Sequence, residues 1–379
     1  MKIICAPNAF KESITSVEAA KVMAKAAKDA GIEDVLEIPV GDGGDGTLDA
    51  LRSVIGGEIV EFQVTGPNWK PVVAPILLFN DGKSAFVEMA KASGLALVPL
   101  DERDPFQTTS YGTGELIRYA ISLGVDEIIL GVGGSATMDG GIGALKALGF
   151  KFIDVRGDEV RPTAEGLVKI RWIDDSDVFE GVKRVKIRIM VDVMNPLVGS
   201  HGAARVYGPQ KGAKDEDLPI IDAGLANLAN KIRRKTGRDI MNLPGAGAAG
   251  GISGSFHGLL NASIEHGIGL FLELVKFDKL LEDTDFVFTG EGKLDRQTVF
   301  GKAPMGVLKA AQKRNVPVVA FAGIVEDWDE LHKAGFLALF SIVPGPVSLG
   351  EALKNASTYL YQTTFEVSAM LKKAVERKI

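Results

Sequence analysis

The fold is decided near the start of the chain, where residues 3–47 read IICAPNAFKESITSVEAAKVMAKAAKDAGIEDVLEIPVGDGGDGT. The apolar run Ile3–Ala6 predicts a buried strand, and Thr15–Glu18 has the spacing of a capping box, which predicts the start of a helix. A second apolar run, Val35–Val40, ends in the loop Gly41–Thr47 before another helical segment. Strand, helix, strand and helix at this spacing are typical of a parallel sheet.

The same alternation returns at the other end of the chain. Predicted strands at Phe286–Thr289, Val318–Ala322 and Leu337–Ile342 alternate with helical segments. The simplest assembly is a doubly wound parallel sheet to which both ends of the chain contribute.

The middle of the chain has a different pattern. Residues 58–100 hold short, partly alternating runs around Asn80-Asp81-Gly82, which is a hairpin signal. We therefore predict an α/β fold in which a second α/β domain is inserted into the first. The predicted ranges are 1–63 with 281–379 for the first domain and 64–280 for the inserted one.

Composition and charge exclude several classes of protein. The net charge of -6 and the sequence pI near 5.5 argue against a nucleic-acid partner. A single cysteine excludes a disulfide framework and a thiolate metal cage, and the four histidines form no HExxH pair. Residues 240–264 carry no charged side chain but contain Pro244 and six glycines, so they predict a glycine-rich loop leading into a buried helix. We expect a soluble, cytoplasmic protein without a membrane partner.

Several apolar runs end in loops that combine glycine with acidic residues. In open α/β sheets the ligand binds at the carboxyl ends of the strands. Glycine lets backbone N–H groups close around phosphate oxygens, and carboxylates beside such amides are explained by Mg²⁺. The alternative for any single carboxylate is a helix N-cap or a turn. The acidic candidates are Asp42, Asp45, Asp139, Asp192, Glu291 and Asp295.

Three lysines are candidates for offsetting the charge of a transferred phosphoryl group. They are Lys11, Lys91 and Lys302. Lys11 is the strongest of them, because the loop after a first strand normally faces the ligand crevice. The alternative for each is a solvated surface lysine.

The nucleotide motif is ambiguous. The sequence has no G-x-x-x-x-G-K-[ST], but Gly131–Ala136 fits G-x-G-x-x-[GA] after a predicted strand, and Asp154 lies 23 residues beyond Gly131. With this spacing, an NAD(P)-dependent dehydrogenase remains an alternative function. A two-domain small-molecule binding protein is the alternative that is not an enzyme.

Taken together, the loops resemble those of the type-I glycerate kinase family over essentially the whole chain. The order and combination of several blocks carry the resemblance: Ala6–Ser13, Gly41–Thr47, Gly133–Gly141, Asp192–Gly199, Gly208–Ala213, Pro244–Gly251 and Thr289–Thr298. The chain departs from the usual family pattern at Asn8 and Ala9 (usually Asp and Ser), at Met138 (usually Asn) and at Lys293 (usually Arg). Asn8 cannot act as a base or supply charge.

The resemblance implies an enzyme that phosphorylates D-glycerate with ATP. The product in most of the family is 2-phosphoglycerate, and in some assignments it is 3-phosphoglycerate. The resemblance also implies a flavodoxin-like domain with an inserted α/β domain and an active site in the cleft between the two. The implied cofactors are ATP and Mg²⁺, the partner is the small molecule D-glycerate, and a homodimer is possible.

Residue roles follow as hypotheses for phosphoryl transfer. Asp42 and Asp192 are predicted to bind Mg²⁺ and to orient or deprotonate the attacking hydroxyl, with these two roles not separated. Lys11 is predicted to offset the charge of the γ-phosphate or of the glycerate carboxylate. The predicted nucleotide-binding residues are Gly133, Gly134, Ser135, Thr137, Gly140 and Gly141, and the other predicted substrate-binding residues are Glu291, Asp295, Arg296 and Lys302.

Overall fold

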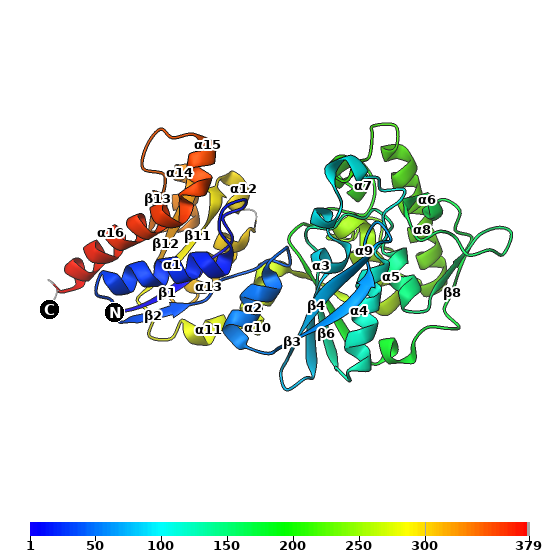
Figure 1. Ribbon diagram of the computed structural model, residues 1–379, viewed down its shortest axis with the longest axis horizontal. Helices are drawn as coiled ribbons and strands as arrows, with labels where there is room; N and C mark the ends of the chain where they lie inside the picture. Colours follow the sequence, from blue (N-terminus) through cyan, green and yellow to red (C-terminus); the bar gives the residue numbers. More distant parts are fainter. Residues whose placement is uncertain (300, 377–379) are drawn as a thin grey trace. The chain divides into compact units, whose positions relative to one another are not determined.

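The computed structural model describes residues 1–299 and 301–376, and its contacts divide the chain into two compact units. Unit 1 consists of Met1–Asp42, Asp49–Gly56 and Ile268–Ile379, and unit 2 consists of Gly43–Leu48 and Gly57–Gly267. Both chain ends therefore belong to the same unit, as their blue and red colours show in Figure 1.

Unit 1 is built on a five-stranded sheet in which every neighbouring pair is parallel. The spatial order is β2-β1-β11-β12-β13. When the strands of this unit are counted along the chain, the order is 2-1-3-4-5, which is the flavodoxin-like order. The predicted fold class is thus confirmed. The strands are β1 (Lys2–Pro7), β2 (Asp34–Glu37), β11 (Phe286–Leu294), β12 (Val318–Val325) and β13 (Ala338–Ser341).

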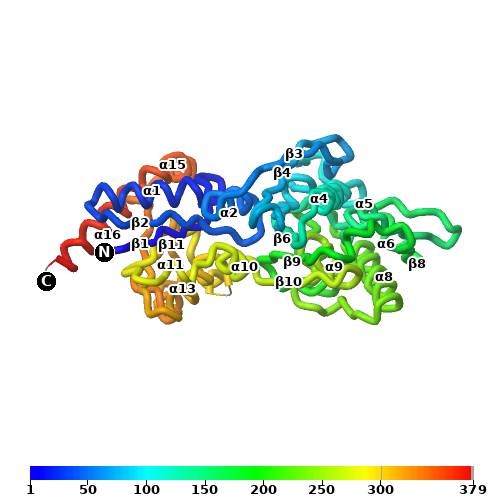
Figure 2. Tube along the Cα trace, turned by 90° about the horizontal axis from the view of Figure 1, so that it is seen from below, coloured from blue at the N-terminus to red at the C-terminus, as the bar shows by residue number. Residues whose placement is uncertain are grey.

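Helices cover both faces of this sheet. Figure 2 shows α1 (Ser16–Asp29) on one side and α11 (Phe277–Leu280) and α13 (Ala303–Gln312) on the other. The long C-terminal helix α16 (Ala356–Glu376) packs against α1 and shares its core. The remaining helices of this unit are α10 (Gly267–Leu274), α12 (Arg296–Val299), α14 (Trp328–Ala334), α15 (Leu349–Lys354) and most of α2 (Thr47–Ile55).

The start of α1 follows from its sequence. The Thr15 hydroxyl accepts from Glu18 N at 3.2 Å, and the Glu18 carboxylate accepts from Thr15 N at 3.0 Å, so the predicted capping box is present. Small residues on one face of the helix, Ala20, Ala24 and Ala27, are fully buried, which allows close approach to the sheet.

Unit 2 is built on a mixed six-stranded sheet in the order β10-β9-β6-β5-β4-β3. The pairs from β3 to β5 are antiparallel and those from β5 to β10 are parallel. Asn80, Asp81 and Gly82 all adopt positive φ in the turn between β4 and β5, which confirms the predicted hairpin. The strands are β3 (Glu58–Thr65), β4 (Pro71–Phe79), β5 (Ser84–Glu88), β6 (Glu127–Gly131), β9 (Lys186–Val191) and β10 (Ser263–His266).

Helices and a small ribbon complete this unit. The ribbon pairs β7 (Lys151–Ile153) with β8 (Trp172–Asp174) in antiparallel fashion. The helices are α3 (Met89–Ser93), α4 (Tyr111–Ser122), α5 (Ile142–Ala147), α6 (Ala164–Leu167), α7 (Ala203–Tyr207), α8 (Leu218–Thr236) and α9 (Ile252–Leu260), with the 3₁₀ turns η1 (Leu95–Leu97), η2 (Leu100–Glu102), η3 (Glu180–Lys183), η4 (Pro209–Lys211) and η5 (Ala248–Gly251).

The uncharged stretch 240–264 has the structure that its glycines predict. It forms a loop with η5 and then the mostly buried helix α9. Among the described residues, no helix has both the length and the apolar character needed to span a bilayer.

Candidate functional site

The strand order of unit 1 creates a topological switch point between β1 and β11, where ligands bind in sheets of this kind. The pairing of β1 with β11 ends at Pro7 and Gly290, while β11 continues to Leu294. Asn8 follows β1, and its backbone N–H donates to the Gly290 carbonyl at 2.8 Å. Glu291, the next residue on β11, therefore lies at the point where the fold favours a ligand.

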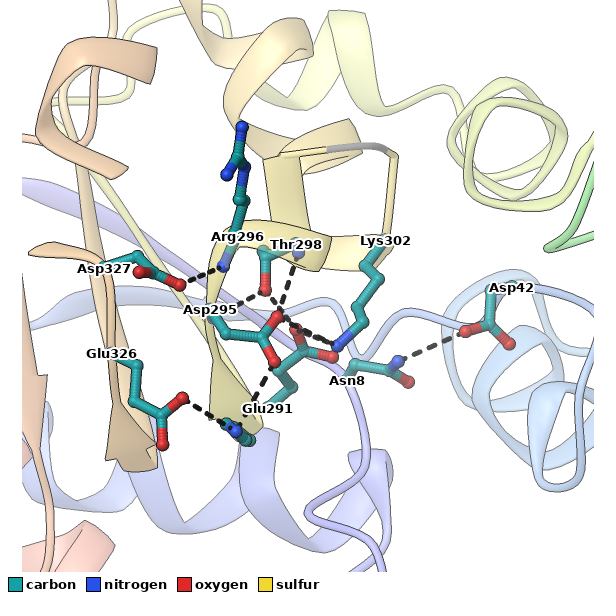
Figure 3. A network of polar contacts seen from close by, with 10 residues as sticks. Asn8, Asp42, Glu291, Asp295, Arg296, Thr298, Lys302, Glu326 and Asp327 are labelled. Carbon is teal, nitrogen blue, oxygen red and sulfur yellow. Dashed lines mark hydrogen bonds and ion pairs between the residues drawn. The ribbon is translucent and has the colours of Figure 1, made fainter. Parts of the chain in front are cut away.

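A cluster of charged and polar groups surrounds Glu291 (Figure 3). Its Oε1 accepts from the Thr298 hydroxyl at 3.1 Å and lies 3.9 Å from Lys302 Nζ. Lys302 Nζ is also 3.6 Å from Asp295 Oδ1, and Asp295 Oδ1 accepts from Thr298 N at 3.3 Å. The structure thus brings together three of the predicted substrate-binding residues, Glu291, Asp295 and Lys302.

The pKa of the Glu291 carboxyl lies well above its usual range. Only 8% of the residue is exposed, and burial raises the pKa of its carboxyl to about 7 against the opposing effect of Lys302. The neighbouring charges of Asp42 and Asp295 raise this pKa further. Near neutral pH this carboxyl can both hold and release a proton.

Asp42 lies beside Asn8 in the same unit. Asn8 Nδ2 donates to Asp42 Oδ2 at 3.4 Å, while Asn8 Oδ1 accepts from Ala9 N at 2.9 Å. Within residues 1–299 and 301–376, no group of three or more His, Cys, Asp or Glu side chains is placed to hold a metal ion. Mg²⁺ needs only one or two protein carboxylates when phosphates and water complete its shell, so the oxygen donor of Asp42 suits such an ion.

Three further residues of unit 1 were either predicted for the site or depart from the family pattern: Lys11, Lys293 and Arg296. Arg296 is 68% exposed at its side chain, pairs with Glu330 at 3.4 Å, and points away from Glu291 and Lys302 in Figure 3. Lys293 forms an ion pair with Glu326 at 2.9 Å, and its Nζ also lies 3.7 Å from Asp295 Oδ2, so Lys293 borders the cluster. Lys11 is exposed in the loop after β1. In this conformation Arg296 does not join the groups around Glu291.

In unit 2, the short segment Gly43–Leu48 lies at the carboxyl ends of the parallel strands. The Gly43 carbonyl accepts from Gly133 N at 2.9 Å, and a Cβ on Gly43 would lie 2.6 Å from the Met190 carbonyl on β9. Glu88, the last residue of β5, accepts from Gly46 N at 3.1 Å and from Leu48 N at 2.9 Å. The carboxyl ends of β5 and β9 and the loop after β6 therefore meet this segment at one edge of the sheet, and Asp42 immediately precedes the segment in sequence.

Glu88 is a buried charged residue that the sequence reasoning did not select. It is fully buried, and desolvation raises the pKa of its carboxyl to about 7, although two backbone N–H donors and Lys91 oppose the shift. Lys91 Nζ lies 3.5 Å from Glu88 and 2.9 Å from the exposed Asp45. The available signal was a glutamate that directly follows the apolar run Ala85–Val87.

The glycine-rich loop Gly133–Gly141 uses much of its backbone internally. The N–H groups of Gly133, Gly140 and Gly141 donate to Gly43 O, Gly250 O and Asp139 Oδ1. A Cβ on Gly133 would lie 2.5 Å from Gly44 Cα, which forbids a side chain there. These three amides are therefore occupied, so of the six predicted nucleotide-binding residues only Gly134, Ser135 and Thr137 remain as candidate donors to a phosphate.

Asp139 holds the loop in shape. It is fully buried and accepts from Ser110 N at 2.8 Å, Ser110 Oγ at 2.7 Å, Gly141 N at 3.0 Å and Gly143 N at 3.2 Å. Burial raises the pKa of this carboxyl despite these donors. A saturated and inaccessible carboxylate is unsuited to a metal ion, so this member of the acidic candidates acts as a structural residue.

Lys211, at the end of η4, is the second charged residue that the sequence reasoning passed over. Its Nζ donates to Ser135 Oγ at 2.8 Å and to the Thr137 carbonyl at 2.9 Å. Burial lowers the pKa of this ammonium to about 7. Its only sequence signal was its place inside the block Gly208–Ala213.

Asp192 directly follows β9 and is exposed. Burial and then the charge of Asp192 raise the pKa of Tyr207 to about 12, and the Tyr207 hydroxyl donates to Asn195 Oδ1 at 2.6 Å. A carboxylate in the loop after β9 thus acts on a hydrogen-bonded phenol at the end of α7.

Comparison with known proteins gives the family. The model of the glycerate kinase family matches residues 3–372. This chain belongs to the glycerate kinase family. The glycerate kinase of Bacillus subtilis (strain 168) is 43% identical over 376 residues, which cover 99% of this chain and 98% of the relative. The glycerate 2-kinase of Escherichia coli (strain K12) is 39% identical over 373 residues, with 98% of each chain covered.

A solved structure agrees with this membership. A protein from Salmonella typhimurium LT2 that is assigned as glycerate kinase 2 superposes with a TM-score of 0.88 at 40% identity, and the match covers 99% of both chains. The glycerate kinase resemblance stated from the sequence is therefore confirmed over the whole chain.

In this glycerate kinase family member, the G-x-G-x-x-[GA] spacing does not form a dinucleotide site. After β6 the loop leads to the short helix α5 and then to β7, which pairs with β8 and not with the main sheet. Asp154 accepts from Arg156 N at 2.8 Å and from Asp158 N at 3.1 Å in a local turn. The motif lacks the parallel βαβ context that a dehydrogenase needs.

Proposed function

We propose that this protein transfers the γ-phosphoryl group of ATP to D-glycerate and forms 2-phosphoglycerate. The observation that carries the proposal is the buried Glu291 cluster at the switch point of a flavodoxin-like sheet, in a chain that belongs to the glycerate kinase family over residues 3–372. Transfer to the 3-hydroxyl is the second candidate. The name of the Escherichia coli relative, glycerate 2-kinase, favours the first.

The donor is proposed to bind through the loop Gly133–Gly141. Thr137 Oγ1 is buried there and has no hydrogen-bond partner within the described part of the chain, which is unusual for a buried hydroxyl. Phosphate oxygens are suitable acceptors for such a group. Mg²⁺ would be held by Asp42 and Asp192 together with phosphate oxygens and water, and it would neutralise charge on the transferred group.

The remaining groups are proposed to position glycerate and to accept the proton of its attacking hydroxyl. The attacking hydroxyl gives its proton to a carboxylate, Asp42 or Asp192, as its oxygen bonds to the phosphorus and the bond from phosphorus to ADP breaks. Lys11 and Lys302 offset the negative charge of the phosphoryl group and the glycerate carboxylate. Glu291 and Asp295 are the other polar side chains proposed to bind the substrate. A cytoplasmic location and a homodimer are part of the same proposal.

The test is ADP release from Mg·ATP with D-glycerate present or absent, and L-glycerate as the matched control. The proposal expects ADP release that depends on D-glycerate and on Mg²⁺. ADP release that does not depend on glycerate would overturn the proposal. Thermal stabilisation by NADH and not by Mg·ATP would also overturn it.

A further inference from the structure

The ammonium of Lys211 is a buried charge that its surroundings do not balance. Both of its hydrogen-bond acceptors, Ser135 Oγ and the Thr137 carbonyl, are neutral. It forms no ion pair with the described residues, and Asp139, the charged group that acts on it, is already saturated by Ser110, Gly141 and Gly143. Without a counter-ion, burial lowers the pKa of Lys211 to about 7, so its charged form is costly at neutral pH and a bound anion would stabilise it.

The hydrogen bond from Lys211 Nζ to Ser135 Oγ also determines where the Ser135 hydroxyl can donate. When Lys211 is protonated it can only donate, so Ser135 Oγ accepts from it and the O–H proton of Ser135 must point to another acceptor. No such acceptor exists among the residues that the structure describes, and Ser135 keeps a small exposed fraction of 6%. With the unpartnered hydroxyl of Thr137, the loop holds two free hydroxyl donors and one positive charge.

A site with free hydroxyl donors, a positive charge and no acceptor suits a bound anion. From this we infer that Lys211 is a positioning residue for the phosphate donor, because its ammonium holds Ser135 as a hydrogen-bond donor toward a phosphate group and supplies the charge that this group meets. The inference rests on the proposed function and deepens it. It assigns the recognition of the donor to a pair of residues 76 positions apart, one in η4 and one in the loop after β6.

The test compares Lys211→Met, Ser135→Ala and the double variant with Lys214→Met, an exposed lysine three residues further along the chain. Calorimetric titration gives the Kd for Mg·ATP, and initial rates give KM for each substrate. Each single change is expected to weaken Mg·ATP binding about 10- to 100-fold and leave the KM for D-glycerate within about twofold of wild type. Because the two residues act as one unit, the double variant should bind no worse than the weaker single variant. Lys214→Met should resemble wild type.

An unchanged Kd for Mg·ATP in folded Lys211→Met, or an equal loss of affinity for Mg·ATP and D-glycerate, would overturn the inference. If Lys211→Met does not fold, Ser135→Ala decides, because unchanged Mg·ATP binding in that variant also overturns it. A wild-type protein that binds Mg·ATP but does not phosphorylate glycerate would refute the proposed function alone, since the binding comparison still tests Lys211.

Discussion

Asp192 is exposed at the carboxyl end of β9, where a carboxylate can reach a small ligand. Asp192→Asn keeps the size of the side chain but removes its charge and its capacity to accept a proton. We expect kcat to fall about 100-fold or more, the range typical of lost general base or metal chemistry. Initial rates at saturating ATP and D-glycerate measure this, with the exposed Asp215→Asn as control. Near-wild-type turnover in folded Asp192→Asn would contradict the assignment.

Glu88 gives a prediction about stability and pH. Its folded pKa of about 7 exceeds the ordinary glutamate pKa of 4.5, so the folded state binds more protons between these two pH values. The stability that the neutral carboxyl provides is present below pH 4.5 and is lost as the pH rises through 7. Glu88→Gln cannot ionise, and its stability relative to wild type should therefore rise between pH 5 and pH 8 by on the order of 2 kcal/mol.

Thermal unfolding of both proteins across this range checks the prediction. Glu216→Gln, a change at an exposed glutamate, is the control and should show no such trend. A constant difference between Glu88→Gln and wild type would show that the buried carboxyl does not titrate near neutrality.

At the scale of elements, the loop glycines serve close packing more than direct ligand contact. Gly133 faces Gly44 so closely that Gly133→Ala should destabilise the fold by about 1–3 kcal/mol through overpacking. Gly269 in α10 has open space around a Cβ, so Gly269→Ala should be neutral or stabilise by about 0.4–1 kcal/mol. Denaturant unfolding of the two variants measures the contrast, and equal costs would refute this explanation of the glycine content.

At the scale of the whole molecule, local patterns predicted the elements of unit 1 and the loops that carry Asp42, Asp192 and Glu291. They predicted the β4–β5 hairpin of unit 2 but not its complete strand order, because the parallel pairs β6–β9 and β9–β10 join segments separated by long stretches of chain. Lys211 and Glu88 were missed for the same reason: their importance comes from burial against Ser135 and Gly46, which no spacing reveals. Three glycines of the predicted phosphate loop use their N–H groups inside the protein, a detail that only the packed structure supplies.

Phosphorus NMR of the reaction mixture shows whether the chain phosphorylates D-glycerate, and on which hydroxyl. A phosphate on the 2-hydroxyl couples to one carbon-bound proton, so we expect a new doublet that grows together with ADP and requires D-glycerate. A new triplet would assign the 3-hydroxyl. If ATP stays intact and no new phosphoester signal forms after incubation of folded protein with Mg²⁺ and D-glycerate, the protein is not a glycerate kinase.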